Sequence, residues 1–311
     1  MKTHLSIGTR GSALALAQAT LVQQQIIKEH PHLSVDLEII KTTGDKIQDV
    51  PLAKIGGKGL FTKEIELAIL AGEVDLGVHS MKDVPTEVPE GLVIGITTVR
   101  EDPRDAFISR KYASLKEVPP GGRIGTGSLR RKAQLLHLRP DVEIVPLRGN
   151  VDTRLRKLVE ENLDGVILAT AGLRRLGRAG EITAIIPADI MVPAIGQGAL
   201  GLEYRQDDEE TRDILAFLDD PATRVAVAAE RAFLARLEGG CQVPIAAQGR
   251  LSNGHLVLDG LIGDLTGSRI FRGQVSGTAA DAAALGQRLA EDLLARGGAQ
   301  ILSEVYGRSF T

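Results

Sequence analysis

The feature that most constrains the fold of this chain is an internal echo between its first and second hundred residues. Three short motifs return in the same order, and a helical pattern follows the first motif in both places. The matched pairs are Ile7–Ser12 with Ile124–Ser128, Glu38–Asp45 with Glu143–Asn150, and Val74–Val78 with Leu163–Ile167. An ordered set of matches is typical of repeated structural units. The sequence therefore predicts two similar α/β domains.

Two chain segments are predicted to cross between the first two domains. One is a charged segment at residues 100–105, and the other is a Pro/Gly-rich segment at residues 193–198. Beyond residue 220 a helical pattern leads to Cys241, and alternating stretches and a last amphipathic helix follow, as in a small α+β domain. The predicted domains are residues 1–99 with 199–219, residues 100–198, and residues 220–311. Because two crossings connect the first two domains, we expect a hinge and a ligand site between them.

Composition excludes several classes of protein. The 311 residues are 43% hydrophobic and 25% charged, and no stretch approaches the roughly 20 apolar residues of a membrane span. The single cysteine excludes an internal disulfide, and the first residues lack the apolar run of a signal peptide, so we expect a cytoplasmic protein. The net charge of -3 and the absence of Trp argue against nucleic-acid binding.

Arginines gather where the predicted strands end, which is the side on which α/β sheets bind ligands. Both echoed turns also place backbone N–H groups at a helix N-terminus, a favourable site for an anion. A solvated surface explains isolated arginines such as Arg156, Arg174 and Arg178. A solvated surface explains the whole set of arginines at the strand ends less well. Planar guanidinium groups match carboxylates, which favours anion binding. The candidate anion-binding residues are Arg10, Arg130, Arg131, Arg148, Arg154 and Arg175.

Asp83 is the candidate acid or base. It follows a predicted strand, lies beside Lys82, and precedes Val84 and Pro85, which restricts the backbone. An aspartate that stabilises a turn fits the local sequence equally well. The six histidines show no spacing typical of a metal site, so we expect no metal.

Cys241 lies in a turn just past a helical pattern. Gly239 and Gly240 end the helix, and Pro244 prevents an immediate return to regular hydrogen bonding. A lone cysteine is usually a small core residue. Its place in a loop instead favours chemistry or covalent attachment.

Seven motifs, in order along nearly the whole chain, resemble those of one known family. They are Gly8–Ser12, Gly57–Phe61, His79–Pro85, Gly125–Arg131, Arg148–Val151, Ala194–Gly198 and Leu237–Cys241. Together they closely resemble the porphobilinogen deaminases, also called hydroxymethylbilane synthases. The resemblance weakens after about Arg250.

The resemblance implies a fold and an activity. The fold is two hinged periplasmic-binding-protein-like α/β domains plus a small C-terminal α+β domain that carries the cofactor cysteine. The activity is that of a transferase in tetrapyrrole and haem biosynthesis, and the protein is expected to be a monomer. It condenses four porphobilinogen molecules head to tail with release of ammonia, and then releases the linear tetrapyrrole hydroxymethylbilane by hydrolysis. The growing chain is anchored to a dipyrromethane cofactor, which a thioether holds to the residue that matches Cys241.

The resemblance also implies residue roles. Asp83 matches the catalytic aspartate. The residues that hold the cofactor carboxylates are Ser80, Lys82, Thr126, Ser128, Arg130, Arg131 and Arg154. Those that bind substrate or the growing chain are Arg10, Ser12, Phe61, Arg148 and Arg175, and Phe61 covers the site together with the segment at residues 42–59. The many carboxylates of a polypyrrole explain so many arginines in a protein of net charge -3.

Two rival interpretations stay open at this point. Two hinged α/β domains with anion-binding turns also describe solute-binding proteins of transport systems, although that class has no use for Cys241. A cytoplasmic anion-sensing regulator, whose third domain contacts a partner, is the second. Neither predicts a covalent adduct on the cysteine.

Overall fold

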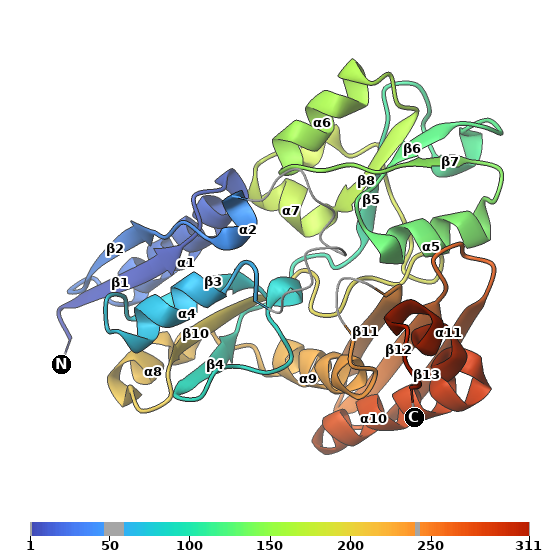
Figure 1. Cartoon of the computed structure of the whole chain (residues 1–311). Helices are drawn as coiled ribbons and strands as arrows, with labels where there is room; N and C mark the ends of the chain where they lie inside the picture. Colours follow the sequence, from blue (N-terminus) through green and yellow to red (C-terminus); the bar gives the residue numbers. More distant parts are fainter. Residues whose placement is uncertain (1, 47–58, 240–242, 311) are drawn as a thin grey trace. The chain divides into compact units, whose positions relative to one another are not determined.

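The computed structural model describes residues 2–46, 59–239 and 243–310 (Figure 1). Within these residues the chain divides into two compact units. One comprises residues 2–46, 59–101 and 198–224, and the other comprises residues 102–197, 225–239 and 243–310. Cys241 and most of the predicted covering segment at 42–59 lie outside the described residues. The three-domain division of the chain stays a prediction.

The first unit is built on a five-stranded sheet with the order β2-β1-β3-β10-β4. Strand β1 is parallel to β2 and β3, whereas β10 is antiparallel to β3 and β4. The strands are β1 (His4–Thr9), β2 (Ser34–Ile39), β3 (Leu76–Ser80), β4 (Leu92–Thr97) and β10 (Leu200–Arg205). The helices are α1 (Ala13–Glu29), α2 (Thr43–Lys46), α4 (Lys63–Leu70) and α8 (Glu209–Leu215).

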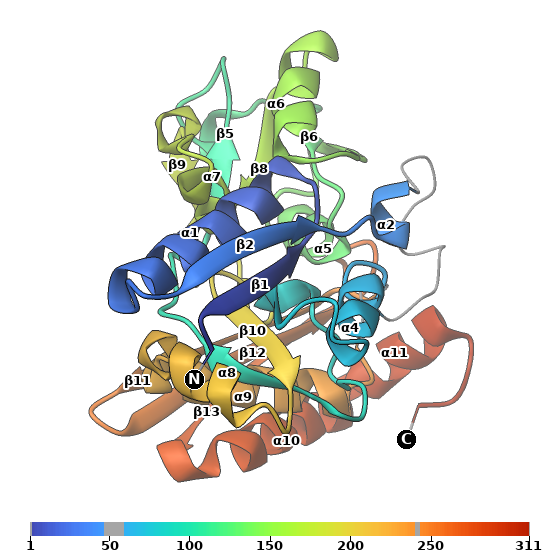
Figure 2. The same ribbon diagram turned by 90° about the vertical axis from the view of Figure 1, so that its left-hand side faces the viewer.

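The alternation of apolar residues places one helix on each face of this sheet. Leu5 and Ile7 of β1 point to the face where Val22 of α1 is buried. On the opposite face Ile65 and Ile69 of α4 pack with Val74. Figure 2 shows α1 and α4 on the two sides of the strands. The helix predicted from the 3.6-residue period after Ser12 is confirmed by α1.

The second unit contains a sheet of the same topology, with the order β7-β6-β8-β5-β9. Here β6 is parallel to β7 and β8, and β5 is antiparallel to β8. Its strands are β5 (Asp105–Ile108), β6 (Arg123–Gly125), β7 (Glu143–Val145), β8 (Gly165–Ala169) and β9 (Ala184–Ile185), and its helices are α5 (Leu129–Leu138), α6 (Val151–Glu160) and α7 (Thr170–Arg175). The echoed motifs occupy equivalent strands in both sheets, so the predicted pair of similar α/β sheets is confirmed.

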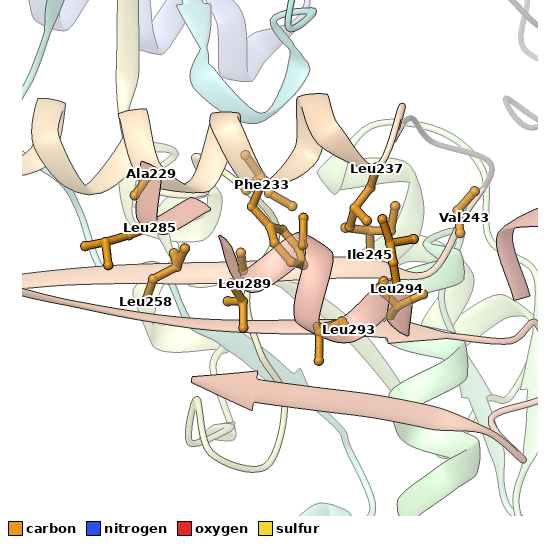
Figure 3. Packing of buried hydrophobic residues seen from close by; sticks show 14 of the residues in the cluster. Ala229, Phe233, Leu237, Val243, Ile245, Leu258, Leu285, Leu289, Leu293 and Leu294 are labelled. Atoms are coloured by element: carbon orange, nitrogen blue, oxygen red, sulfur yellow. The ribbon is translucent and has the colours of Figure 1, made fainter. Parts of the chain in front are cut away.

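The second unit also holds a three-stranded antiparallel sheet. Its strands are β11 (Ile245–Ser252), β12 (His255–Gly263) and β13 (Ile270–Thr278). Helices α9 (Pro221–Arg236), α10 (Ala282–Leu293) and α11 (Ala299–Tyr306) contribute to its core. Figure 3 shows Phe233 of α9 packed among the leucines of α10, with no exposed surface. Burying a side chain of that size contributes about 1.5–3 kcal/mol.

Within the described part of the chain, no helix is long and apolar enough to cross a membrane.

A network of charges fixes the N-terminal strand of the first unit. The ammonium group of Lys2 donates hydrogen bonds to Asp75 Oδ1 at 2.7 Å, to Asp208 Oδ2 at 2.9 Å and to Thr211 Oγ1 at 2.6 Å. Asp208 also caps α8, because its carboxylate accepts a bond from the Thr211 amide. Burial raises the pKa of Asp208, but the bonds from Thr211 and Lys2 outweigh burial and lower it to about 2.

We predict that Asp208→Asn lowers the free energy of unfolding by about 1–2 kcal/mol at pH 7, because asparagine keeps the helix cap through Oδ1 but loses the charge and the oxygen that accepts from Lys2. A carboxyl whose pKa is depressed on folding stabilises the protein above its unfolded pKa, and that stability is lost as the pH falls. The difference between wild type and variant therefore shrinks as the pH falls toward 2. Urea unfolding at pH 7 and pH 3 measures it. An equal difference at both pH values would contradict the charge assignment.

Candidate active site

The predicted site residues of the first unit lie at the carboxyl ends of its parallel strands. Arg10 follows β1 directly, and Ser80 is the last residue of β3. The chain then forms a single 3₁₀ turn, Met81–Asp83, in which Met81 is buried and Lys82 and Asp83 are exposed. The Val84 amide closes the turn with a hydrogen bond to the Met81 carbonyl, at 3.2 Å. The turn therefore presents the Asp83 carboxyl at the edge of the sheet where α/β folds bind ligands.

Ser80 is held by a residue that the sequence analysis missed. Its hydroxyl accepts a hydrogen bond from Nε2 of Gln18, at 2.9 Å. Gln18 lies on the buried face of α1, between Ala15 and Ala19, and is only 3% exposed. A polar residue at a core-facing position of a helical pattern needs a partner, and this signal could have revealed Gln18.

Arg10 and Phe61 contact each other. The guanidinium carbon of Arg10 lies 4.1 Å from the centre of the Phe61 ring, a cation–π geometry. On Gly44 a Cβ atom would lie 2.2 Å from the same ring, so only glycine allows this close approach. Ser12, the third predicted residue here, caps α1 by accepting a hydrogen bond from the Ala15 amide. The structure thus brings together Arg10 and Phe61 from motifs about fifty residues apart.

The second unit repeats this arrangement at the carboxyl ends of β6, β7 and β8. Thr126 follows β6, and its hydroxyl accepts a hydrogen bond from the Ser128 amide at 3.2 Å. Ser128 in turn caps α5. Arg154 of α6 donates from Nε to the Gly149 carbonyl at 2.9 Å. The half-buried Arg148 precedes α6, and the half-buried Arg175 ends α7.

Arg130 and Arg131 are buried, and they share one carboxylate. Arg130 Nη1 donates to Asp105 Oδ2 at 2.7 Å, and Arg131 Nη2 donates to Asp105 Oδ1 at 2.8 Å. Gln197 Nε2 donates to Asp105 Oδ1 at 2.9 Å. Sequence analysis placed Asp105 in a charged link, which was wrong, because Asp105 begins β5 and has no exposed surface. An acidic residue directly before the apolar run at 106–108 was the available signal.

Comparison with known proteins identifies the family. Residues 5–213 match the profile described as porphobilinogen deaminase, dipyrromethane cofactor binding domain, and residues 225–295 match the porphobilinogen deaminase C-terminal domain. The chain belongs to the porphobilinogen deaminase family. Porphobilinogen deaminase of Trichlorobacter lovleyi is 59% identical over 98% of this chain and 97% of its own length. Porphobilinogen deaminase of Geobacter sulfurreducens is 57% identical over 98% of this chain and 96% of its own length.

Among solved structures, the methionine binding protein MetQ is similar with a TM-score of 0.43. It is 15% identical, and the match covers 70% of this chain and 89% of that protein.

The charges around Asp105 fit the carboxylated cofactor of a porphobilinogen deaminase. Burial raises the pKa of Asp105, but Arg130 and Arg131 outweigh burial and hold it far below its usual range. Burial also lowers the pKa of Arg130, with Asp105 opposing and Arg131 adding to the shift. One carboxylate thus stands against two buried guanidinium groups. Buried charges require partners. A second carboxylate, supplied by the cofactor, would balance the remaining positive charge.

Arg130 also keeps hydrogen-bond donors for such a group. Within the described residues, both hydrogen bonds of the Arg130 side chain start from Nη1. One goes to Asp105 and the other to the Val192 carbonyl. Its Nε and Nη2 atoms therefore fit a ligand carboxylate, which a guanidinium binds through two parallel bonds. The roles of the individual residues nevertheless stay predictions.

We predict that Asp105→Asn lowers the free energy of unfolding by about 3–5 kcal/mol, because it leaves two buried guanidinium groups without a counter-charge. Urea unfolding measures the loss. Asp152→Asn is the matched control, since Asp152 pairs with Arg178 on the surface of the same unit. That variant is expected to cost under about 1 kcal/mol. Equal losses in the two variants would contradict the role of Asp105.

Proposed function

We propose that this porphobilinogen deaminase condenses four porphobilinogen molecules head to tail, with Asp83 as the catalytic acid and base and with Arg130 and Arg131 holding cofactor carboxylates. The observation that carries this proposal is the buried pair of guanidinium groups around Asp105, which has one positive charge in excess and unused donors on Arg130. A pyrrole chain with acetate and propionate groups supplies carboxylates of the required kind.

Cys241 is proposed as the point of attachment, because it is the only cysteine of the chain. The dipyrromethane, when bound, supplies the pyrrole carbon to which the first substrate molecule is joined. Ser80, Lys82, Thr126, Ser128 and Arg154 are proposed to bind its other carboxylates. Each of them lies at the carboxyl end of a parallel strand or in the adjoining turn or helix. A hydroxyl donates one hydrogen bond and an ammonium three, so this set favours anions.

The exposed position of Asp83 suits proton transfer. As the carbon–nitrogen bond of the aminomethyl group breaks, the nitrogen leaves with the bonding electrons as ammonia. In this step the Asp83 carboxyl group donates the proton with which the amine nitrogen leaves as ammonia, and its carboxylate then stabilises the positive charge left on the substrate. When the new carbon–carbon bond forms, Asp83 accepts the proton that the pyrrole carbon loses. Each cycle consumes one porphobilinogen and releases one ammonia.

Arg10, Ser12, Phe61, Arg148 and Arg175 are proposed to bind the incoming substrate and the growing chain. The stacking of Arg10 on Phe61 supports this assignment, because the ring fixes the orientation of a guanidinium group, and planar guanidinium groups match carboxylates.

We further propose a cytoplasmic monomer that binds no nucleic acid. One cysteine allows no intrachain disulfide, and the net charge of -3 does not favour polyanions.

Asp83→Asn is expected to lower kcat by about 10²- to 10⁴-fold, because asparagine cannot transfer a proton. The circular dichroism spectrum stays unchanged, because Asp83 is exposed and packs in no core. Ammonia release from porphobilinogen measures the rate. Glu90→Gln, which removes another exposed carboxylate from the segment between β3 and β4, serves as a control with wild-type turnover. Wild-type turnover in Asp83→Asn would reject the catalytic assignment.

The covalent cofactor gives a second test. The intact mass of the purified protein is expected to exceed the sequence mass, and Ehrlich's aldehyde is expected to colour the protein. Cys241→Ser removes both the added mass and the colour. Active protein with an unmodified mass would refute the attachment.

A further inference from the structure

Three titratable side chains that the proposed mechanism does not use are buried together in the first unit. They are His79 of β3, Glu203 of β10 and Glu66 of α4, with 4%, 1% and 8% of their surfaces exposed. Nε2 of His79 lies 3.0 Å from Oε2 of Glu203. Glutamate is almost never fully buried unless it is paired. The contact between His79 and Glu203 therefore has a structural or a functional role.

The strand register brings His79 and Glu203 together. In the antiparallel pairing of β10 with β3, Gly201 lies opposite His79 and Glu203 lies opposite Gly77. His79 and Glu203 consequently point to the same face of the sheet, the one covered by α4. On Gly77 a Cβ atom would lie 2.8 Å from Nε2 of His79 and 2.7 Å from Cγ2 of Ile65. Glycine at this position leaves the room that the pair occupies.

The charges in this group are limited by burial. Burial raises the pKa of Glu66, the neighbouring Glu203 raises it further, and His79 opposes the shift. The contact between Nε2 of His79 and Oε2 of Glu203 gives both side chains a partner within the core. Nowhere in the described part of the chain are three His, Cys, Asp or Glu side chains arranged to hold a metal ion. The group is therefore best explained as a buried hydrogen-bonded pair, His79 and Glu203, with the carboxyl of Glu66 beside it.

His79 lies two residues before the start of the proposed catalytic turn. β3 continues from His79 to Ser80 and then into Met81–Asp83. β10 begins alongside, with Leu200 opposite Ser80 and with the Ala199 carbonyl accepting a hydrogen bond from the Met81 amide at 3.0 Å. α4, which supplies Glu66, begins two residues after Phe61. The group thus joins α4, which follows Phe61, to β3, which leads into Ser80 and Asp83, and to the neighbouring strand β10.

We propose that His79 and Glu203 are positioning residues, whose buried hydrogen bond fixes the end of β3 against β10 and so holds the Met81–Asp83 turn in the geometry that turnover requires. This inference rests on the proposed catalytic role of Asp83. A displacement of about 1 Å in a catalytic group can cost about 100-fold in rate. Loosening the pair therefore affects the chemical step more than the binding of substrate.

The test compares cofactor-bearing wild-type protein with Glu203→Gln and His79→Gln in steady-state turnover of porphobilinogen. Intact mass gives the fraction of molecules that carry cofactor, and kcat is expressed per such molecule. We expect kcat to fall about 10- to 100-fold in both variants while KM stays within about twofold. Asp208→Asn is the matched control, because it removes a charged contact of the same unit outside the site and is expected to keep the wild-type kcat.

Three outcomes separate this inference from the proposed function. Loss of turnover in Asp83→Asn together with wild-type kcat in Glu203→Gln and His79→Gln would overturn the inference alone. Wild-type turnover in Asp83→Asn would overturn the catalytic assignment and, with it, the inference. Should the single variants fail to fold, the double variant His79→Gln/Glu203→Gln, which leaves no unpaired charge, decides by the same readouts. A reduced kcat at unchanged KM supports the inference, and a wild-type kcat overturns it.

Discussion

The carboxylate of Asp105 links three segments of the second unit. It starts β5, binds Arg130 and Arg131 at the start of α5, and accepts a hydrogen bond from Gln197. A buried ion network of this kind contributes little net stability compared with an apolar core, but removal of one partner is costly. The network therefore fixes where α5 begins relative to the sheet. It also keeps two guanidinium groups in place at the edge where ligands bind, with only one carboxylate to balance them.

The two units share one sheet topology, and in both the predicted site residues lie at the carboxyl ends of parallel strands. In each sheet, three parallel strands end at a common edge, and a serine caps the helix that follows the central strand. The two edges differ in chemistry. In the first unit the edge presents an exposed carboxyl on the Asp83 turn, supported by the buried pair of His79 and Glu203. In the second unit it presents guanidinium groups. The proposed acid–base residue thus belongs to the first unit, and the two buried arginines proposed to hold cofactor carboxylates belong to the second.

Much of this could be predicted from the sequence, and the exceptions have physical causes. The ordered echo revealed the paired sheets, and strand ends marked the edge residues, because both depend on local patterns. Asp105, Gln18 and Glu203 were missed as partners because each contacts a residue at least 25 positions away. Local sequence shows that a buried polar residue needs a partner, but not which one it has. Arg130 and Arg131 were predicted as anion-binding arginines, but their burial and their shared partner Asp105 could not be predicted from local sequence.

The central claim is that the excess positive charge around Asp105 binds a carboxylate of the cofactor. A crystal structure of the cofactor-bearing protein tests it most directly. We expect a cofactor carboxylate within hydrogen-bonding distance of Nε or Nη2 of Arg130, with the bonds from Nη1 to Asp105 and to the Val192 carbonyl unchanged. A cofactor whose carboxylates are all bound by other groups, with neither Nε nor Nη2 of Arg130 in contact, would contradict the account.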